Sequence, residues 1–179
     1  MINRISSLFA LSLLCSAAAP SHPASAADSG HSLRSELVGT WVLADMHADT
    51  WDGDDRNPFG AHPQGRMILD QAGHATVVII GADRLQFRSA DRLTGSAEEN
   101  QAAVQGSQSF YGTYTVGESD HSLVFHIERS SFANWDGTAQ ESTITLNADV
   151  LTQIKPGPHS SYGVARWQRV RDVEVAQQR

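Results

Sequence analysis

A histidine and a glutamate two residues apart, directly before an Asn-Trp turn, are the residues of this sequence whose types and spacing first suggest chemistry. They are His126 and Glu128, within the stretch VFHIERSSFANWDGTAQ at residues 124–140. Successive side chains of a strand point to opposite faces. His126 and Glu128 therefore share one face of a predicted strand at 121–130, and the other face of that strand is apolar.

The orientation of this strand decides what the pair can do. If Leu123, Phe125 and Ile127 pack inward, His126 and Glu128 lie in water, where an exposed pair contributes little. If the pair instead faces a cavity, a partly desolvated carboxylate tends to hold its proton, and a nearby imidazole can exchange it. The two side chains then serve as general acid and base, or anchor one polar group of a ligand. The residues alone leave both interpretations open.

The turn after this strand carries a large aromatic residue. Gly137 suits a turn position with positive φ, and Trp135 offers a flat surface with one N–H donor. Two roles remain open for Trp135, because it either fills part of the core or contacts a ligand.

No other stretch has the spacing of a known catalytic or metal site. Residues 45–55 are rich in aspartate, and hard cations bind several oxygens, but the regular spacing and closing Glu of an EF-hand loop are missing. We expect a solvated hairpin tip there and no metal site. The HExxH, GxSxG, GxGxxG and P-loop motifs are also absent. These absences disfavour hydrolases and nucleotide-dependent enzymes, and we expect no cofactor.

The first 26 residues have the layout of a secretory signal peptide. Arg4 supplies the positive start, residues 5–19 are mostly apolar, and the Ala-Ser-Ala of residues 24–26 provides a cleavage site. The apolar run is too short to span a bilayer comfortably. We therefore expect an exported protein, periplasmic or secreted, that is not inserted in a membrane after signal cleavage.

The composition limits the partners and the sources of stability. The formal net charge is −7, and the 13 Lys and Arg residues form no basic cluster, which disfavours nucleic-acid and anionic-membrane partners. The single cysteine, Cys15, lies in the expected leader, so the mature chain cannot form a disulfide of its own. Stability must therefore come from a hydrophobic core. None of these features predicts an oligomeric state.

Short strands separated by turn residues organise the rest of the chain. We expect a signal peptide at 1–26, a flexible lead-in at 27–35, one folded domain at 36–172 and a C-terminal tail at 173–179. Alternating apolar residues bounded by turn residues predict eight strands, at 39–46, 65–70, 74–81, 109–117, 121–130, 139–147, 150–155 and 161–170.

The links between these strands indicate how they are connected. Most are short, which favours antiparallel neighbours in a meander, and eight strands at this spacing suggest a barrel or a sandwich. The exception is the segment 95–106, where Ser96 and Glu99 form a capping box and a glycine provides the stop. That pattern predicts one helix within the strand series.

Several segments, taken in chain order, carry a resemblance to a known family. They are Leu37-Val-Gly-Thr-Trp-Val-Leu43, Asn57-Pro-Phe-Gly60 with Pro63-x-Gly65, Gly73-His-Ala-Thr76, Gly95-Ser-Ala-Glu-Glu99, Gly112-Thr-Tyr114, and His126-x-Glu128-x-Ser130 followed by Phe132-x-Asn134-Trp135-x-Gly137-Thr138-x-Gln140. This ordered set resembles the lipocalin-like domain family of bacteria and fungi, which is related to the calycin barrels. The chain departs from the family at Ala133, where proline is frequent, and at Ser142 and Thr143, near which a basic residue is frequent.

The resemblance implies both a fold and a group of residues. The implied fold class is all-β: a single antiparallel lipocalin-like β-barrel of about eight strands with one short helix, with room for about one small ligand. The resemblance also implies that His126, Glu128, Asn134, Trp135 and Gln140 form one recurrent block. It does not say what these residues touch, because fold is not function.

Three functions remain open for such a barrel. The first is binding of a small hydrophobic or amphipathic molecule, and the candidate contacts for its polar end and its surroundings are Tyr114, Asn134, Trp135 and Gln140 together with the His-Glu pair. The second is a cofactor-independent isomerase, cyclase or lyase with His126 and Glu128 as catalytic acid and base. The third is a structural or interaction module whose barrel is filled by its own core.

Overall fold

The computed structural model describes residues 32–49, 59–157 and 162–171. The expected signal peptide at 1–26, the first part of the lead-in, residues 50–55 of the aspartate-rich stretch and the tail at 173–179 lie outside the described residues. The elements are α1 (Leu33–Leu37), β1 (Gly39–Asp49), β2 (Gln64–Leu69), β3 (His74–Ile80), α2 (Ala97–Gln105), β4 (Ser107–Gly117), β5 (Ser122–Ser130), the 3-10 helix η1 (Ala133–Trp135), β6 (Ala139–Asn147), β7 (Val150–Pro156) and β8 (Tyr162–Arg169).

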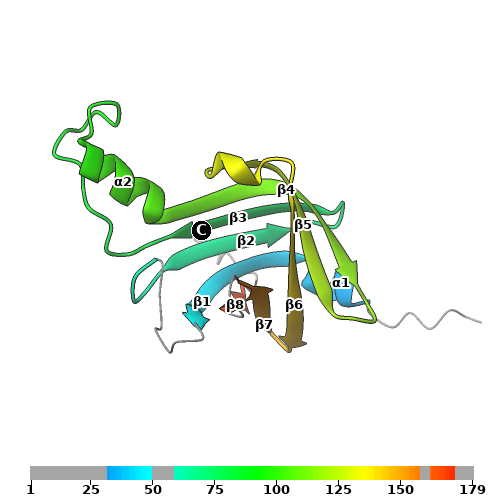
Figure 1. The fold of residues 1–179 in the computed structure, drawn as a ribbon. Coiled ribbons are helices and arrows are strands. Elements are labelled where there is room, and N and C mark those ends of the chain that lie inside the picture. The colour runs from blue at the N-terminus through cyan, green and yellow to red at the C-terminus, as the bar shows by residue number, and fades with distance from the viewer. Residues whose placement is uncertain (1–31, 50–58, 158–161, 172–179) are drawn as a thin grey trace, which may run out of the picture. The chain divides into compact units, whose positions relative to one another are not determined.

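The eight strands close into one barrel. Each strand pairs antiparallel with the next along the chain, and β8 pairs with β1 to complete the ring (Figure 1). The all-β meander of eight strands is confirmed, and the barrel is the arrangement that the structure has. The predicted strands agree with the observed ones to within a few residues at each end.

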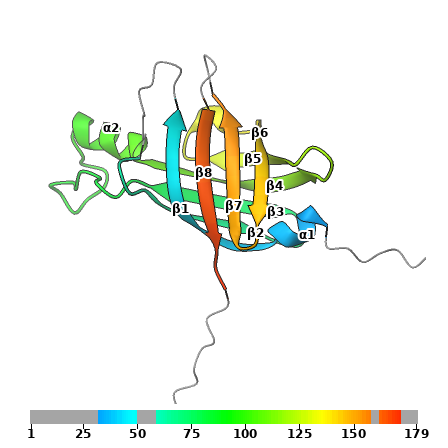
Figure 2. The same ribbon diagram turned by 90° about the horizontal axis from the view of Figure 1, so that it is seen from below.

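The two α-helices lie at different ends of the strands (Figure 2). The predicted capping box of α2 is present: Ser96 Oγ accepts from the Glu99 N–H at 3.2 Å, and Glu99 Oε2 accepts from the Ser96 N–H at 2.8 Å. No helix is predicted at α1, which overlaps the end of the expected lead-in at 27–35 and the first two residues of the expected domain. The side chain of Ser32 caps it by accepting from the Ser35 N–H at 3.1 Å, so the end of the expected lead-in is ordered.

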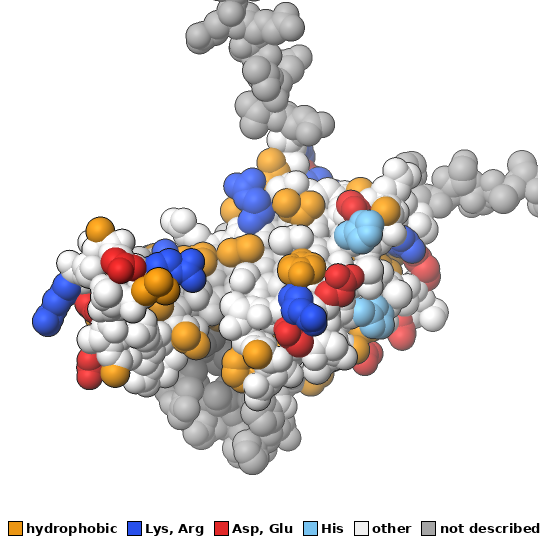
Figure 3. Space-filling view, turned by 90° about the horizontal axis from the view of Figure 1, so that it is seen from above, with side chains coloured by type: hydrophobic (Ala, Val, Ile, Leu, Met, Phe, Trp, Pro, Cys, Tyr) orange, Lys and Arg blue, Asp and Glu red, His pale blue; other side chains and the backbone are white. Residues whose placement is uncertain are grey.

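The barrel interior follows from the period-two pattern of the strands. On β5, Leu123, Phe125 and Ile127 are 0%, 4% and 2% exposed, whereas His126 and Glu128, on either side of Ile127, are exposed on the outer face. Burial of apolar side chains is the main favourable term in folding, so the apolar face of each strand turns inward. On the side of η1 and β4, charged, histidine and apolar side chains are interspersed over the outer surface (Figure 3).

One end of the barrel is sealed by Trp41 and Arg169. Trp41 is fully buried, and its indole Nε1–H donates to the carbonyl oxygen of Leu37 at 3.0 Å. The Arg169 guanidinium lies 4.2 Å from the centroid of the Trp41 ring and donates to the carbonyl oxygens of Val38, at 3.0 Å, and Glu36. The start of β1, the end of β8 and helix α1 are thereby tied together, which leaves the opposite end as the way into the interior.

Two glycines are required by the backbone around β5. A Cβ on Gly112 would overlap the carbonyl oxygen of His126, because β4 has a register shift at this point and the two backbones approach closely. Gly137 has a φ of 72°, which confirms the positive φ expected in the turn after β5. Among the described residues, no helix is long and apolar enough to cross a membrane.

Candidate functional site

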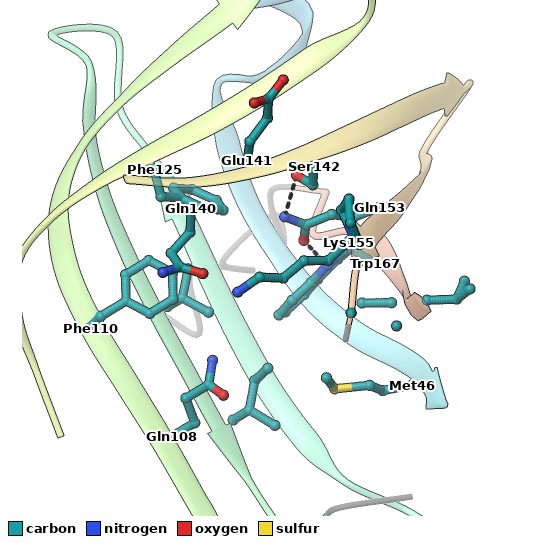
Figure 4. A pocket seen from close by; sticks show the side chains of 17 residues that line it. Met46, Gln108, Phe110, Phe125, Gln140, Glu141, Ser142, Gln153, Lys155 and Trp167 are labelled. Atoms are coloured by element: carbon teal, nitrogen blue, oxygen red, sulfur yellow. Dashed lines mark hydrogen bonds between the residues drawn. The ribbon is translucent and has the colours of Figure 1, made fainter. Parts of the chain in front are cut away.

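The candidate site is a cavity inside the barrel, at the end opposite α1. Its volume is about 310 Å³, and its walls come from the end of β1, from β3 to β7 and from the start of β8. Most of the lining is apolar and includes Phe110, Phe125, Trp167, Ile79 and Val164 (Figure 4). These residues occupy the inward positions of their strands, so the alternation that builds the core also builds the cavity. The barrel is therefore not filled completely by its own side chains.

Two phenylalanine rings form one wall of this cavity, and a tryptophan ring packs beside them. The rings of Phe110 and Phe125 pack edge to face with their centroids 5.2 Å apart, and Trp135 packs on Phe110 at 6.3 Å. Trp135 belongs to η1, the single turn between β5 and β6, and it is partly buried. Of the two roles expected for Trp135, packing on the core is present in the structure, and contact with a ligand stays a prediction.

A chain of hydrogen bonds satisfies the buried polar groups of the opposite wall. The Trp167 indole Nε1–H donates to Gln153 Oε1 at 3.3 Å, and Gln153 Nε2 donates to Ser142 Oγ at 2.9 Å (Figure 4). Ser142, which is 2% exposed, donates in turn to the carbonyl oxygen of Leu123 at 3.1 Å. Buried polar groups are costly unless they are paired, so these three hydrogen bonds stabilise the barrel itself.

Lys155 places a cation inside this largely apolar space. It lies near the end of β7 and is the only lysine in the 179-residue sequence. Its ammonium nitrogen Nζ lies 4.5 Å from the centroid of the Trp135 ring, within the range of a cation–π contact. Burial lowers the pKa of Lys155, because desolvation disfavours the charged form. Across residues 32–49, 59–157 and 162–171, no ion pair involves this amine.

Two glutamine side chains share the space with Lys155. The Gln140 amide and the Lys155 amine point toward one another across the cavity, and Gln108 extends its amide into the same region (Figure 4). Gln140 is held from the turn, because its Nε2 donates to Thr138 Oγ1 at 3.2 Å and Thr138 Oγ1 donates to the Trp135 carbonyl at 2.8 Å. The cavity therefore has apolar walls and one polar region made of an amine and two amides.

The remaining predicted ligand contacts lie elsewhere. Tyr114 is 2% exposed and is not part of the cavity lining; its hydroxyl donates to the carbonyl oxygen of Asp70 at 2.9 Å, and burial raises its pKa. Asn134 is exposed on η1. Of the four residues expected to contact a ligand, only Gln140 lines the cavity. Trp135 packs beside it, on Phe110 and Lys155, and Tyr114 and Asn134 lie away from it.

The His-Glu pair lies outside the barrel. His126 and Glu128 are exposed, and His126 Nε2 lies 3.2 Å from Thr115 Oγ1 on the neighbouring strand β4. The interpretation that turned this pair toward a cavity is therefore wrong, because Leu123, Phe125 and Ile127 take the inward positions of the strand. An acid and base role inside the barrel required that inward position. The structure instead has the water-facing alternative.

The recurrent block around this pair builds the turn that supports the cavity rim. The Ser130 N–H donates to Asp136 Oδ1 at 2.7 Å, and the N–H groups of Gly137 and Thr138 donate to the Ile127 and Trp135 carbonyls. These bonds hold η1 against the end of β5. This recurrent block therefore has a structural role, because its hydrogen bonds position Trp135 and Gln140.

Lys155 is the important residue that sequence reasoning missed. A signal for it was present, because the alternation of β7 puts Leu151, Gln153 and Lys155 on one face. A lysine in register with a buried leucine is unusual for a solvated strand. Because the sequence contains no second lysine, this position could have been singled out.

Among the described residues, no group of three or more His, Cys, Asp or Glu side chains is placed to hold a metal ion. The described part of the aspartate-rich stretch instead makes surface contacts. Asp45 Oδ2 lies 3.3 Å from both His47 Nδ1 and Arg166 Nη1.

Comparison with known proteins gives one family match. The model of the lipocalin-like domain family matches residues 38–170, which spans the barrel from the start of β1 to the end of β8. The resemblance seen in the sequence is thus confirmed.

Individual relatives are more distant. The 4'-hydroxy-3'-methoxypropiophenone carrier protein ppsC of Aspergillus oryzae is 29% identical over 72 residues, covering 37% of this chain and 65% of that protein, which is less than two thirds of its length. Among solved structures, a redesigned beta barrel is 16% identical with a TM-score of 0.41 and covers 77% of this chain and 95% of its own. The fluorescent protein UnaG is 16% identical with a TM-score of 0.36, covering 75% and 98%.

Proposed function

Because this chain belongs to the lipocalin-like domain family, we propose that it is an exported carrier that binds one small, largely apolar molecule inside its barrel. The observation that carries this proposal is the cavity of about 310 Å³ at the end opposite α1. Ligand sites are typically concave, mostly apolar and roughly 300–1,000 Å³ in size, with a few placed polar groups. Lys155, Gln140 and Gln108 provide such groups here.

The name of one relative supports carriage rather than catalysis. The Aspergillus oryzae protein is named as a carrier of 4'-hydroxy-3'-methoxypropiophenone, a small aromatic ketone with a phenol group. A molecule of that kind combines a flat apolar body with polar oxygens. In this chain, the body would pack between Phe110, Phe125 and Trp167, and an oxygen would face Lys155 and Gln140.

Export is supported by the sequence of the first 26 residues alone. Their positive start, apolar run and small residues at 24–26 favour passage through a secretory pathway and a carrier that works in the periplasm or the medium. Amino-terminal sequencing of the protein recovered from the host envelope and from the medium tests this. A chain beginning at Ala27 is expected, and an intact leader in a cytoplasmic fraction would contradict the proposal.

The cavity is tested by filling it. Native mass spectrometry of the protein from its own host should show a small molecule travelling with it. In Ala165→Phe, a ring is added to an inward residue of the cavity lining, so the bound mass should be lost. The matched control is Ala139→Phe, which adds the same ring at an exposed position on β6 and should retain the bound mass. Equal retention by the two variants would rule out the cavity as the binding site.

A further inference from the structure

We propose that Lys155 captures its ligand covalently, because its amine faces a largely apolar cavity in which an aldehyde or ketone carbonyl can form a reversible imine with it. This inference rests on the proposed carrier function and names the ligand class: small, apolar carbonyl compounds. It adds a bond-forming step that carriage by packing alone does not include.

The position of the amine is the first support. Lys155 extends from β7 into the cavity, and its Nζ lies over the Trp135 ring at 4.5 Å (Figure 4). Because Lys155 lines the same cavity as Phe110 and Trp167, a molecule that packs against these two rings lies beside the amine. Because holding two reactants together replaces a bimolecular encounter, even a modest nucleophile gains greatly from this placement.

The protonation state of the amine is the second support. An imine forms from the neutral amine, and a surface lysine is almost entirely charged at neutral pH. Burial lowers the pKa of Lys155, so a larger share of the amine is neutral than at the surface. Within the described part of the chain, no carboxylate pairs with this amine. The contact that favours its charged form there is the cation–π contact with the Trp135 ring.

The chemistry balances without a redox partner. The Nζ lone pair attacks the carbonyl carbon, and the carbonyl oxygen takes up a proton to give a carbinolamine. The nitrogen loses one of its two hydrogens in that step, and loss of the new hydroxyl together with the second hydrogen as water leaves a C=N bond in place of the C=O bond. The amides of Gln140 and Gln108, which point into the same space, can donate N–H groups to the carbonyl oxygen. Hydrolysis of the imine releases the ligand unchanged, as a carrier requires.

The sequence contains few other amines that could compete with Lys155 for a carbonyl compound. With 12 arginines and one lysine, the chain has two kinds of amine nucleophile only, Lys155 and the α-amino group. Guanidinium groups stay charged and do not form imines under these conditions. A carbonyl compound therefore meets only one lysine in this chain, and that lysine lines the cavity.

The test uses the full-length protein with 2-naphthaldehyde as the probe and sodium cyanoborohydride to reduce any imine to a stable amine. Peptide mapping should separate the adduct at Lys155 from any adduct at the α-amino group, and the Lys155 adduct should form at least about tenfold faster in the folded protein than in protein unfolded by urea. The matched control is the double variant Ile154→Lys with Lys155→Arg. It moves the lysine by one residue to the exposed outer face, where Ile154 lies. That variant should lose the fast adduct.

The alcohol 2-naphthalenemethanol separates this inference from the function on which it rests, because it has the same shape without the carbonyl. It should bind the wild type and alter the fluorescence of Trp167. If the alcohol binds but Lys155 is labelled no faster in the folded protein than in the unfolded one, covalent capture is overturned and carriage stands. Equal labelling in the double variant also overturns covalent capture. If neither probe binds, both proposals fail.

Discussion

Replacing Gln153 with leucine tests whether the polar wall of the cavity is held by protein groups alone. Gln153 accepts from the Trp167 indole N–H at 3.3 Å and donates to Ser142 Oγ at 2.9 Å. Trp167 and Ser142 are 1% and 2% exposed, so both become buried groups with a missing partner. Leucine has a similar size, so the substitution removes hydrogen bonds without opening a large void.

The expected loss can be worked out from these contacts. An unpaired buried indole N–H costs about 1–3 kcal/mol, toward the lower end here because the original bond is long. Ser142 loses a donor but keeps its own bond to the Leu123 carbonyl, which costs about 0.5–1 kcal/mol. We expect Gln153→Leu to lower the free energy of unfolding by about 2 kcal/mol. For a domain of this size, the melting temperature should fall by roughly 6–10 °C.

Urea denaturation followed by circular dichroism measures this loss directly. The matched control is Gln168→Leu, the same substitution at the exposed position beside Trp167 on β8, and its effect should stay within about 0.5 kcal/mol. In a double-mutant cycle with Ser142→Ala, a coupling of about 1 kcal/mol is expected. A loss below about 0.5 kcal/mol for Gln153→Leu would refute the reasoning, because it would mean that water in the cavity satisfies the freed groups.

Three further predictions concern the surface and the sealed end. His126→Ala and Glu128→Gln should each leave urea stability within about 0.5 kcal/mol and leave 2-naphthalenemethanol binding unchanged in a fluorescence titration; a tenfold loss of affinity would contradict their outward placement. Arg169→Met removes a guanidinium that binds two carbonyl oxygens and an indole ring, so calorimetry should show a loss of about 2–4 kcal/mol, and a loss below about 1 kcal/mol would show that the seal does not depend on it. Hydrogen bonds from the His74 N–H and imidazole lower the pKa of Asp70, so the unfolded chain takes up this proton at a higher pH than the folded one. The resulting stability is present above the ordinary Asp pKa of about 3.9 and is lost as the pH falls through the lower folded value. Asp70→Asn should therefore narrow the difference in melting temperature between neutral and acidic buffers, and an unchanged difference would count against this pair.

The fold was predictable from the sequence because its signals are local. Period-two alternation placed eight strands, and turn residues such as Gly137 placed the reversals, where the structure has a φ of 72°. The Ser96 and Glu99 capping box placed α2 for the same reason. Helix α1 was missed, because a single turn capped by Ser32 has too few residues to show helical periodicity.

The site was less predictable, because it depends on which face of each strand turns inward and on how deep each residue lies. The pattern of β5 favoured Leu123, Phe125 and Ile127 as the inward set, and the structure agrees. The resemblance to the family favours an inward placement of His126 and Glu128 more than the pattern alone does. In the structure, the recurrent block instead builds the η1 turn. Tyr114 is inward yet lies in the packed core rather than along the cavity, a difference in depth that no sequence pattern records.

The pairing of β1 with β8 determines the stage of folding at which the cavity forms. All other strand pairs join neighbours in the chain, but Trp41 meets Arg169, so the ring closes across nearly the whole domain. Such distant pairing makes folding slow, because the entropy of closing a long loop must be lost before the contact forms. The cavity is walled by β1 and β8 together, so it does not exist in a chain whose last strand is still free. A small molecule can therefore occupy the cavity only after β8 has paired with β1, and its binding would stabilise only the closed barrel.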